Sequence, residues 1–141
     1  KIESSVKKML KDEENFGIKK FKTYKEFGEK VYKIRENVIK RIKKLKKKNK
    51  TIVGYGAPAK ATTALNFFGI SEEIDFIVED NKLKLNKFIP GVKILIKNKS
   101  QIKNKNNILI VLAWNFYEDI KKNNSDLSNN FINIKELETN S

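Results

Sequence analysis

The pattern in this chain most suited to binding an anion is a glycine-rich stretch, Gly54-Tyr55-Gly56-Ala57-Pro58-Ala59-Lys60. Gly54, Gly56 and Ala59 fit the spacing G-x-G-x-x-G/A, in which glycines permit a tight turn and a close approach of the backbone to phosphate. Pro58 suits the first turn of a helix, where its missing N–H costs little. Lys60 places a cation in that turn, which opposes the helix dipole unless an anion lies nearby. The stretch predicts an anion- or nucleotide-binding loop; a plain strand-to-helix turn with a solvated Lys60 is the structural alternative.

An acidic pair follows the next apolar segment of the chain. Glu79 and Asp80 stand 23 and 24 positions after Gly56. In a dinucleotide site, an acidic residue about 20 positions beyond the glycines holds a ribose hydroxyl. An Asx turn at Asp80-Asn81 explains the pair equally well.

The segment after the acidic pair carries two lysines and a turn signal. Lys84 and Lys87 stand on a predicted loop, where they are candidates to clamp an anionic substrate. Pro90-Gly91 is a common turn dipeptide and needs no ligand to explain it. The two lysines therefore stay open as ligand contacts, and the turn is the preferred interpretation of Pro90 and Gly91.

An aromatic and polar group closes the longest apolar run. Trp114 is the only tryptophan of the chain, and its ring is suited either to stacking on a base or sugar or to filling the core. Asn115 and Glu118 have the spacing of a helix-capping box, which favours a structural role for Glu118.

The elements that must position these groups begin at Thr51. Strands are predicted at 51–56, 74–78, 92–96, 107–114 and 131–134, with helices at 58–69 and 115–124. Continuous apolar strands separated by helices are typical of a mostly parallel sheet that is covered on both faces. We therefore predict an α/β fold over residues 51–141: a Rossmann-like, mostly parallel five-stranded sheet with flanking helices, in which a loop at 81–91 replaces one crossover helix. All the groups above then fall at the carboxyl ends of strands, where such sheets bind ligands.

Residues 1–50 predict a basic, amphipathic helical arm. Thr23 is a candidate cap for a helix whose apolar side chains recur every three or four residues, and a shorter helix over 1–22 is expected to break at Gly17. A single apolar stripe must pack on something, so we expect the arm to pack on the sheet domain.

The positive charge belongs mostly to this arm. Of the formal net charge of +14, the first 50 residues carry +12 and the remainder +2. Only Arg35 and Arg41 are arginines, whereas nucleic-acid readers usually rely on arginine for bidentate contacts. A solvated helix face explains the lysine-rich run near the end of the arm better than a nucleic-acid site does.

The composition also excludes several chemistries. There is no cysteine and no histidine, which rules out disulfides, thiol catalysis, thiolate or imidazole metal sites and a histidine base. We therefore assign no catalytic and no metal-binding residue. No apolar run approaches the roughly 20 residues that cross a bilayer, and no signal-peptide pattern is seen, so a cytoplasmic protein is expected.

Three blocks of the sequence together resemble a known family. The segments GYGAPAKATTALNFFGI, DFIVEDNKLKLNKFIPGVKILI and ILIVLAWNFYEDI are similar to the C-terminal domain of the S-adenosylmethionine-dependent sugar C-methyltransferases, and KDEENFGI and TYKEFGEKV resemble the segment preceding it. The resemblance implies an enzyme that methylates a ring carbon of nucleotide-linked deoxysugars. It also implies zinc-binding and methyltransferase domains upstream, and a C-terminal domain that helps to hold the nucleotide-sugar.

The resemblance assigns substrate-binding positions residue by residue. The stretch from Gly54 to Lys60 would form the phosphate-side loop, and the other motif positions are Asp80, Lys84, Pro90, Gly91, Trp114, Asn115 and Glu118. This domain would bind no cofactor itself, and the full-length enzyme would use S-adenosylmethionine. Asn86 stands where the family usually has glycine, which is a departure. The alternatives are an NAD(P)-binding oxidoreductase domain, resting on the glycines and the acidic pair, and, less favoured, a basic nucleic-acid-binding module.

Overall fold

The computed structural model describes residues 3–47, 50–103 and 105–139. The chain divides into two compact units, Lys1–Ile34 and Arg35–Ser141. The division falls inside the second helix.

The first unit is helical. Helix α1 (Ser4–Phe16) ends at Gly17, whose left-handed backbone, with φ 82°, lets its N–H bond the carbonyls of Glu13 and Glu14. The predicted break at Gly17 is thereby confirmed. Helix α2 (Phe21–Lys46) begins before Thr23, so the predicted Thr23 cap is wrong. The hydroxyl of Thr23 instead donates to the Gly17 carbonyl at 2.8 Å, which closes the turn between the helices.

The later part of α2 belongs to the second unit. Val38 and Ile42 are completely buried there. Arg35 Nε donates to the Phe67 carbonyl at 2.6 Å, and Arg41 Nη1 donates to the Thr139 carbonyl at 2.8 Å. The two arginines of the chain therefore bind backbone carbonyls of their own protein, which further weakens the nucleic-acid interpretation.

The second unit is built on a five-stranded, wholly parallel sheet. Its strands are β1 (Thr51–Tyr55), β2 (Phe76–Val78), β3 (Ile96–Lys97), β4 (Asn107–Val111) and β5 (Phe131–Asn133). Their spatial order is β3-β2-β1-β4-β5, and every pair is parallel. After β1 the chain continues to β2 and β3 at one edge of the sheet, and after β4 it continues to β5 at the other edge. The point at which the strand order reverses, the topological switch point, therefore lies between β1 and β4. The predicted α/β, Rossmann-like fold is confirmed.

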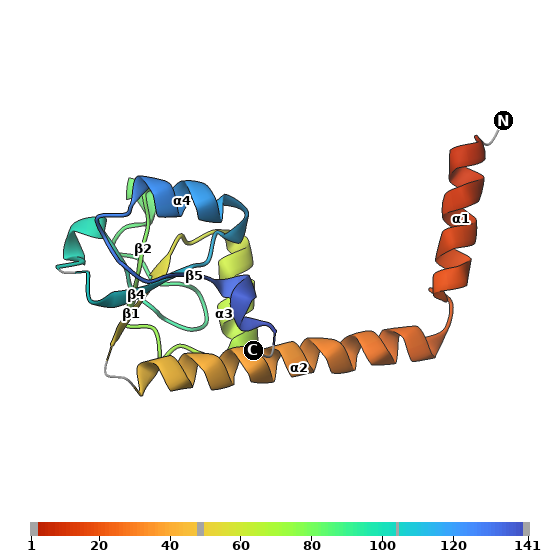
Figure 1. The fold of residues 1–141 in the computed structure, drawn as a ribbon, viewed down its shortest axis with the longest axis horizontal. Helices are drawn as coiled ribbons and strands as arrows, with labels where there is room; N and C mark the ends of the chain where they lie inside the picture. The colour runs from red at the N-terminus through yellow and green to blue at the C-terminus, as the bar shows by residue number, and fades with distance from the viewer. Residues whose placement is uncertain (1–2, 48–49, 104, 140–141) are drawn as a thin grey trace. The chain divides into compact units, whose positions relative to one another are not determined.

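Helices cover the sheet on both faces. Helix α3 (Ala59–Phe68) follows β1 and helix α4 (Tyr117–Asn123) follows β4. Because parallel crossovers are right-handed, helices that lead toward opposite edges lie on opposite faces. In Figure 1, α4 lies on one side of the sheet and the later part of α2 on the other. Tyr117 and Ile120 of α4 pack on a buried face of the sheet that includes Tyr55.

The predicted third strand is shorter than expected. The spacing predicted a strand over 92–96, but β3 holds only Ile96 and Lys97. The preceding residues fold back on residues 86–89: Asn86 N–H donates to the Ile96 carbonyl at 2.8 Å, Ile96 N–H donates to the Lys87 carbonyl at 2.8 Å, and an antiparallel bridge joins Phe88 and Leu95. A 3-10 turn, η1 (Lys82–Lys84), and this hairpin stand where a crossover helix would otherwise run.

The predicted fourth strand also ends early. It stops at Val111, and the chain then enters a 3-10 turn, η3 (Trp114–Phe116). Within the described ranges, none of the helices has the length and apolar character needed to cross a membrane.

Candidate functional site

The two glycines of the loop after β1 are required by the protein's own packing. A Cβ at Gly54 would lie 2.8 Å from Ile77 Cγ1 and 3.0 Å from Leu112 Cδ1. Gly56 has φ 88°, and a Cβ there would lie 3.0 Å from the Cβ of Ala113. The glycine pattern therefore has a structural explanation and is not by itself evidence for a ligand.

A glutamate clamps the peptide that follows Gly56. The N–H of Ala57 donates to Glu79 Oε2 at 2.8 Å, and the N–H of Asn81 donates to Glu79 Oε1 at 3.1 Å. Lys84 Nζ donates to the Ala57 carbonyl at 2.9 Å and lies 3.5 Å from Glu79 Oε2. Both polar groups of Ala57 are therefore engaged within the protein.

The Glu79 carboxylate is held ionised. Burial by itself would raise the pKa of Glu79, but the N–H donors of Asn81 and Ala57 and the Lys84 ammonium together bring it below its usual value. A negative carboxylate on the Ala57 N–H repels a phosphate from that position. Both oxygens of the Glu79 carboxylate accept hydrogen bonds from the protein's own backbone, so this carboxylate is not free to bind a ribose hydroxyl. This observation weakens the alternative that the chain is an NAD(P)-binding domain.

Asp80 belongs to a second polar network, beside the first. Tyr55 Oη donates to Asp80 Oδ2 at 2.7 Å and lies 3.2 Å from Asn124 Oδ1. Lys99 Nζ lies 2.9 Å from Asp80 Oδ1 and donates to Asn124 Oδ1 at 3.2 Å. This network ties the ends of β1, β2 and β3 to the end of α4.

The network shifts the titration of both its acids. Burial first, and then the hydrogen bond to Asp80, raises the pKa of Tyr55. Burial would also raise the pKa of Asp80, but the Tyr55 hydroxyl and the Lys99 ammonium bring it below its usual value. The Asx turn proposed for this segment involves the next residue: Asn81 Oδ1 accepts from the N–H of Leu83 and caps η1.

Pro90 and Gly91 contact helix α3. Asn66 Nδ2 donates to the Pro90 carbonyl at 2.9 Å. Gly91 has φ 83°, and a Cβ there would lie 1.9 Å from Asn66 Oδ1. Both residues serve the hairpin and its packing on α3, as the turn interpretation expects. Asn86 has φ 60°, a left-handed conformation that asparagine tolerates better than most other residues with a side chain do.

Trp114 stands half-exposed where β4 turns into η3. Lys60 Nζ lies 4.1 Å from the centre of its indole ring, and Lys135 Nζ lies 5.7 Å from it. Trp114 thus contacts two cations, one from the first turn of α3 and one from the 3-10 turn η4 (Ile134–Leu137). We call Lys60, Trp114 and Lys135 the Trp114 site.

The predicted capping box at Asn115 and Glu118 is not formed. Both side chains are exposed, and α4 begins at Tyr117 with no side-chain cap. The η3 turn is the physical reason, because it places Phe116 rather than Asn115 before the helix.

The first turn of α3 presents backbone donors beside Lys60. The Pro58 carbonyl accepts from the N–H groups of Ala61 and Thr62, as a helix start requires. Within residues 3–47, 50–103 and 105–139, the N–H groups of Ala59 and Lys60 have no hydrogen-bond acceptor. Free N–H groups at a helix start attract anions, and here a lysine side chain accompanies them.

Comparison with known proteins agrees with the three sequence blocks. A family model described as "C-methyltransferase C-terminal domain" matches residues 1–133. The chain belongs to this family. It is 30% identical over 131 residues to "C-methyltransferase NovU" of Streptomyces niveus, an alignment covering 92% of this chain and 31% of that protein. The chain therefore spans about a third of the length of this curated relative, and the resemblance read from the sequence is confirmed.

Sequence reasoning missed several residues of this C-methyltransferase C-terminal domain. Lys99 and Asn124 join the Asp80 network, and Lys135 joins the Trp114 site, from segments that carry no motif. Glu79 was a candidate only for a ribose contact. Its role as a clamp depends on the distance between two strand ends, and no local pattern reports that distance.

Other features of this C-terminal domain lie away from the Trp114 site. A hollow of about 250 Å³ is lined by Thr51 and Asn107, the first residues of β1 and β4, and therefore lies at the amino edge of the sheet. Among the described residues, no group of histidine, cysteine, aspartate and glutamate side chains is arranged to hold a metal ion.

Proposed function

We propose that this chain is the substrate-binding C-terminal part of an S-adenosylmethionine-dependent C-methyltransferase that acts on nucleotide-linked deoxysugars. In this proposal the Trp114 site and the first turn of α3 hold the nucleoside diphosphate portion of the substrate. In this proposal the chain itself carries no catalytic group. The Glu79 clamp argues against the alternative function, an NAD(P)-binding oxidoreductase domain.

The observation that carries the proposal is the set of donors beside Trp114. Lys60 Nζ lies over the half-buried ring of Trp114, and Lys60 belongs to the first turn of α3, whose first N–H groups are free, at the switch point between β1 and β4. Open parallel sheets bind ligands at this point. A cation, free amides and an indole face match the phosphate and the ring of a nucleotide.

The remaining parts of the reaction are assigned to other parts of the enzyme. S-adenosylmethionine would supply the methyl group and would be bound by a methyltransferase domain upstream of this chain. A separate zinc-binding domain is also expected upstream. This chain would bind and orient the nucleotide-sugar so that the acceptor carbon faces the methyl donor. A cytoplasmic location stays a prediction of the sequence.

Calorimetric titration tests the proposal directly. The chain is titrated with uridine 5′-diphosphate, thymidine 5′-diphosphate and NADH. Binding of a nucleoside diphosphate, weakened about tenfold by Lys60→Gln, is expected, because one charge-assisted contact to phosphate is worth about 1.4 kcal/mol. Absence of binding by both diphosphates, or tighter binding of NADH, contradicts the proposal.

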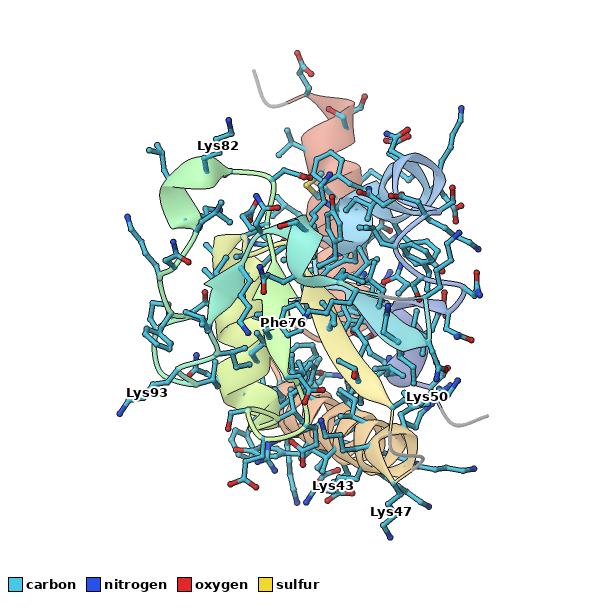
Figure 2. The ribbon with its side chains drawn as sticks, turned by 90° about the vertical axis from the view of Figure 1, so that its left-hand side faces the viewer. Lys43, Lys47, Lys50, Phe76, Lys82 and Lys93 are labelled. Carbon is cyan, nitrogen blue, oxygen red and sulfur yellow. The ribbon has the colours of Figure 1, made fainter. Side chains whose placement is uncertain are left out.

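A matched variant separates a specific contact from a general loss of positive charge. Figure 2 shows Lys43 extending outward from α2, and this side chain is exposed. Lys43→Gln removes the same charge as Lys60→Gln from the amino edge of the sheet. It is expected to leave nucleotide affinity within about twofold of the parent. An equal loss in both variants would mean that net charge alone attracts the nucleotide.

A further inference from the structure

Two lysines from distant parts of the sequence meet at one aromatic ring. Lys60 belongs to the first turn of α3, and Lys135 belongs to η4, which follows the last strand. Their ammonium nitrogens lie 4.1 and 5.7 Å from the centre of the Trp114 ring. Both cations are thus brought to one small surface at the carboxyl edge of the sheet.

Within the described part of the chain, neither of these two cations forms an ion pair with a carboxylate. Two neighbouring lysines are paired, Lys84 with Glu79 and Lys99 with Asp80. In contrast, no ion pair among the described residues includes Lys60 or Lys135. Contact with an indole face attracts an ammonium group but leaves its charge in place. Two positive charges that each lie within 6 Å of the centre of one ring, without a carboxylate partner among the described residues, favour the binding of an anion at this surface.

The carboxylates on this side of the domain do not change that conclusion. Glu118 and Glu136 lie close enough to Tyr117 that their charges, after burial, contribute to the raised pKa of that phenol. Neither forms an ion pair with Lys60 or Lys135 in the part of the chain that the structure describes.

The backbone that carries Lys135 is held in place. Asn133 Oδ1 accepts from the N–H of Lys135 at 3.1 Å, which caps η4. Ile134 and Leu137, on either side, are buried. Arg41 of α2 donates to the carbonyl of Glu136, within the turn, and to that of Thr139, two residues after it. Lys135 is therefore presented by a fixed turn and does not belong to a loose end.

We propose that Lys60 and Lys135 together read a diphosphate group, so that this domain prefers nucleoside diphosphates over monophosphates. The inference rests on the proposed function and assigns a second phosphate contact to the same site. Lys135 lies two residues beyond the part of the chain that the family model matches, so the match itself assigns this residue no role. One phosphate would lie at Lys60 and the start of α3, and the other would bind Lys135.

A set of titrations with paired ligands tests the inference. Uridine and thymidine 5′-monophosphates and 5′-diphosphates are titrated by calorimetry into the parent, Lys60→Gln, Lys135→Gln, Lys135→Arg and the control Lys43→Gln. Thermal unfolding followed by circular dichroism checks that each variant is folded. The parent is expected to bind each diphosphate at least about tenfold more tightly than its monophosphate.

Lys135→Gln is expected to remove that preference. Affinity for the diphosphate falls about tenfold, and affinity for the monophosphate changes less than about threefold, because only the second phosphate loses its partner. Lys60→Gln is expected to weaken the binding of both ligands. Lys135→Arg is expected to keep the preference for diphosphate, and Lys43→Gln to leave the affinity for either ligand unchanged.

The outcomes separate this inference from the proposed function. Suppose that diphosphates bind, but that Lys135→Gln keeps the full preference or lowers the affinities for monophosphate and diphosphate by the same factor. The role proposed for Lys135 is then wrong, and the proposed function stands. If the parent binds no nucleotide at all, the proposed function fails and this inference fails with it.

Discussion

The Glu79 clamp predicts a stability that depends on pH in a defined direction. Glu79→Gln keeps the size of the side chain but removes the charge that accepts hydrogen bonds from two backbone N–H groups and attracts Lys84. The carboxylate is only 13% exposed, so its contacts are little screened by solvent. A hydrogen bond to a charged group contributes about 1.5–3 kcal/mol. Because the amide of glutamine keeps one acceptor, we expect a loss of about 2 kcal/mol in the free energy of unfolding at pH 7.

The pH dependence follows from the lowered pKa of Glu79. A carboxyl whose folded pKa lies below its unfolded value of 4.5 stabilises the folded state above pH 4.5. That contribution is lost as the pH falls through the folded pKa of Glu79. Below that pH the Glu79 side chain of the parent is neutral, as the glutamine of the variant is at every pH. The difference between parent and Glu79→Gln should therefore shrink on acidification from pH 7 to below pH 4.

Urea denaturation at several pH values measures this difference. Glu72→Gln is the matched control, because Glu72 is exposed and its substitution should change stability by less than about 0.5 kcal/mol. The reasoning is refuted if Glu79→Gln is as stable as the parent at pH 7, or if the gap between the two widens as the pH falls.

Two further substitutions test the frame of the site. Gly91→Ala should destabilise by more than Gly69→Ala in urea denaturation: both positions have positive φ, which costs about 1–2 kcal/mol for alanine, but only at Gly91 would the new Cβ overlap Asn66. Equal losses would mean that Asn66 moves aside. Tyr55→Phe should remove the latest-titrating phenol from an alkaline absorbance titration, because burial and Asp80 raise the pKa of Tyr55. An unchanged late phase would place that phenol elsewhere.

Local patterns determined the class of fold and the edge of the sheet at which we propose the site. Apolar runs such as 107–111 and the glycine-bounded helix 59–68 depend on neighbours in the sequence, so their periodicity predicts them. A parallel sheet then places the strand ends at one edge, which brings the loop after β1 and Trp114 together. The family could be inferred from the sequence alone, because three blocks of the chain resemble it, and the family model matches residues 1–133.

Contacts between distant segments were decided only by the tertiary structure. The third strand is shorter than predicted because the chain folds back over residues 86–96. The backbone groups of the residues before Ile96 bond residues 86–89 there. The turn η3 replaced the predicted cap at Asn115. Glu79 became a clamp on Ala57, and Lys135 reached Trp114 from η4. In each case the deciding quantity is a distance of a few ångströms between residues far apart in the chain, and only packing of the whole sheet sets such a distance.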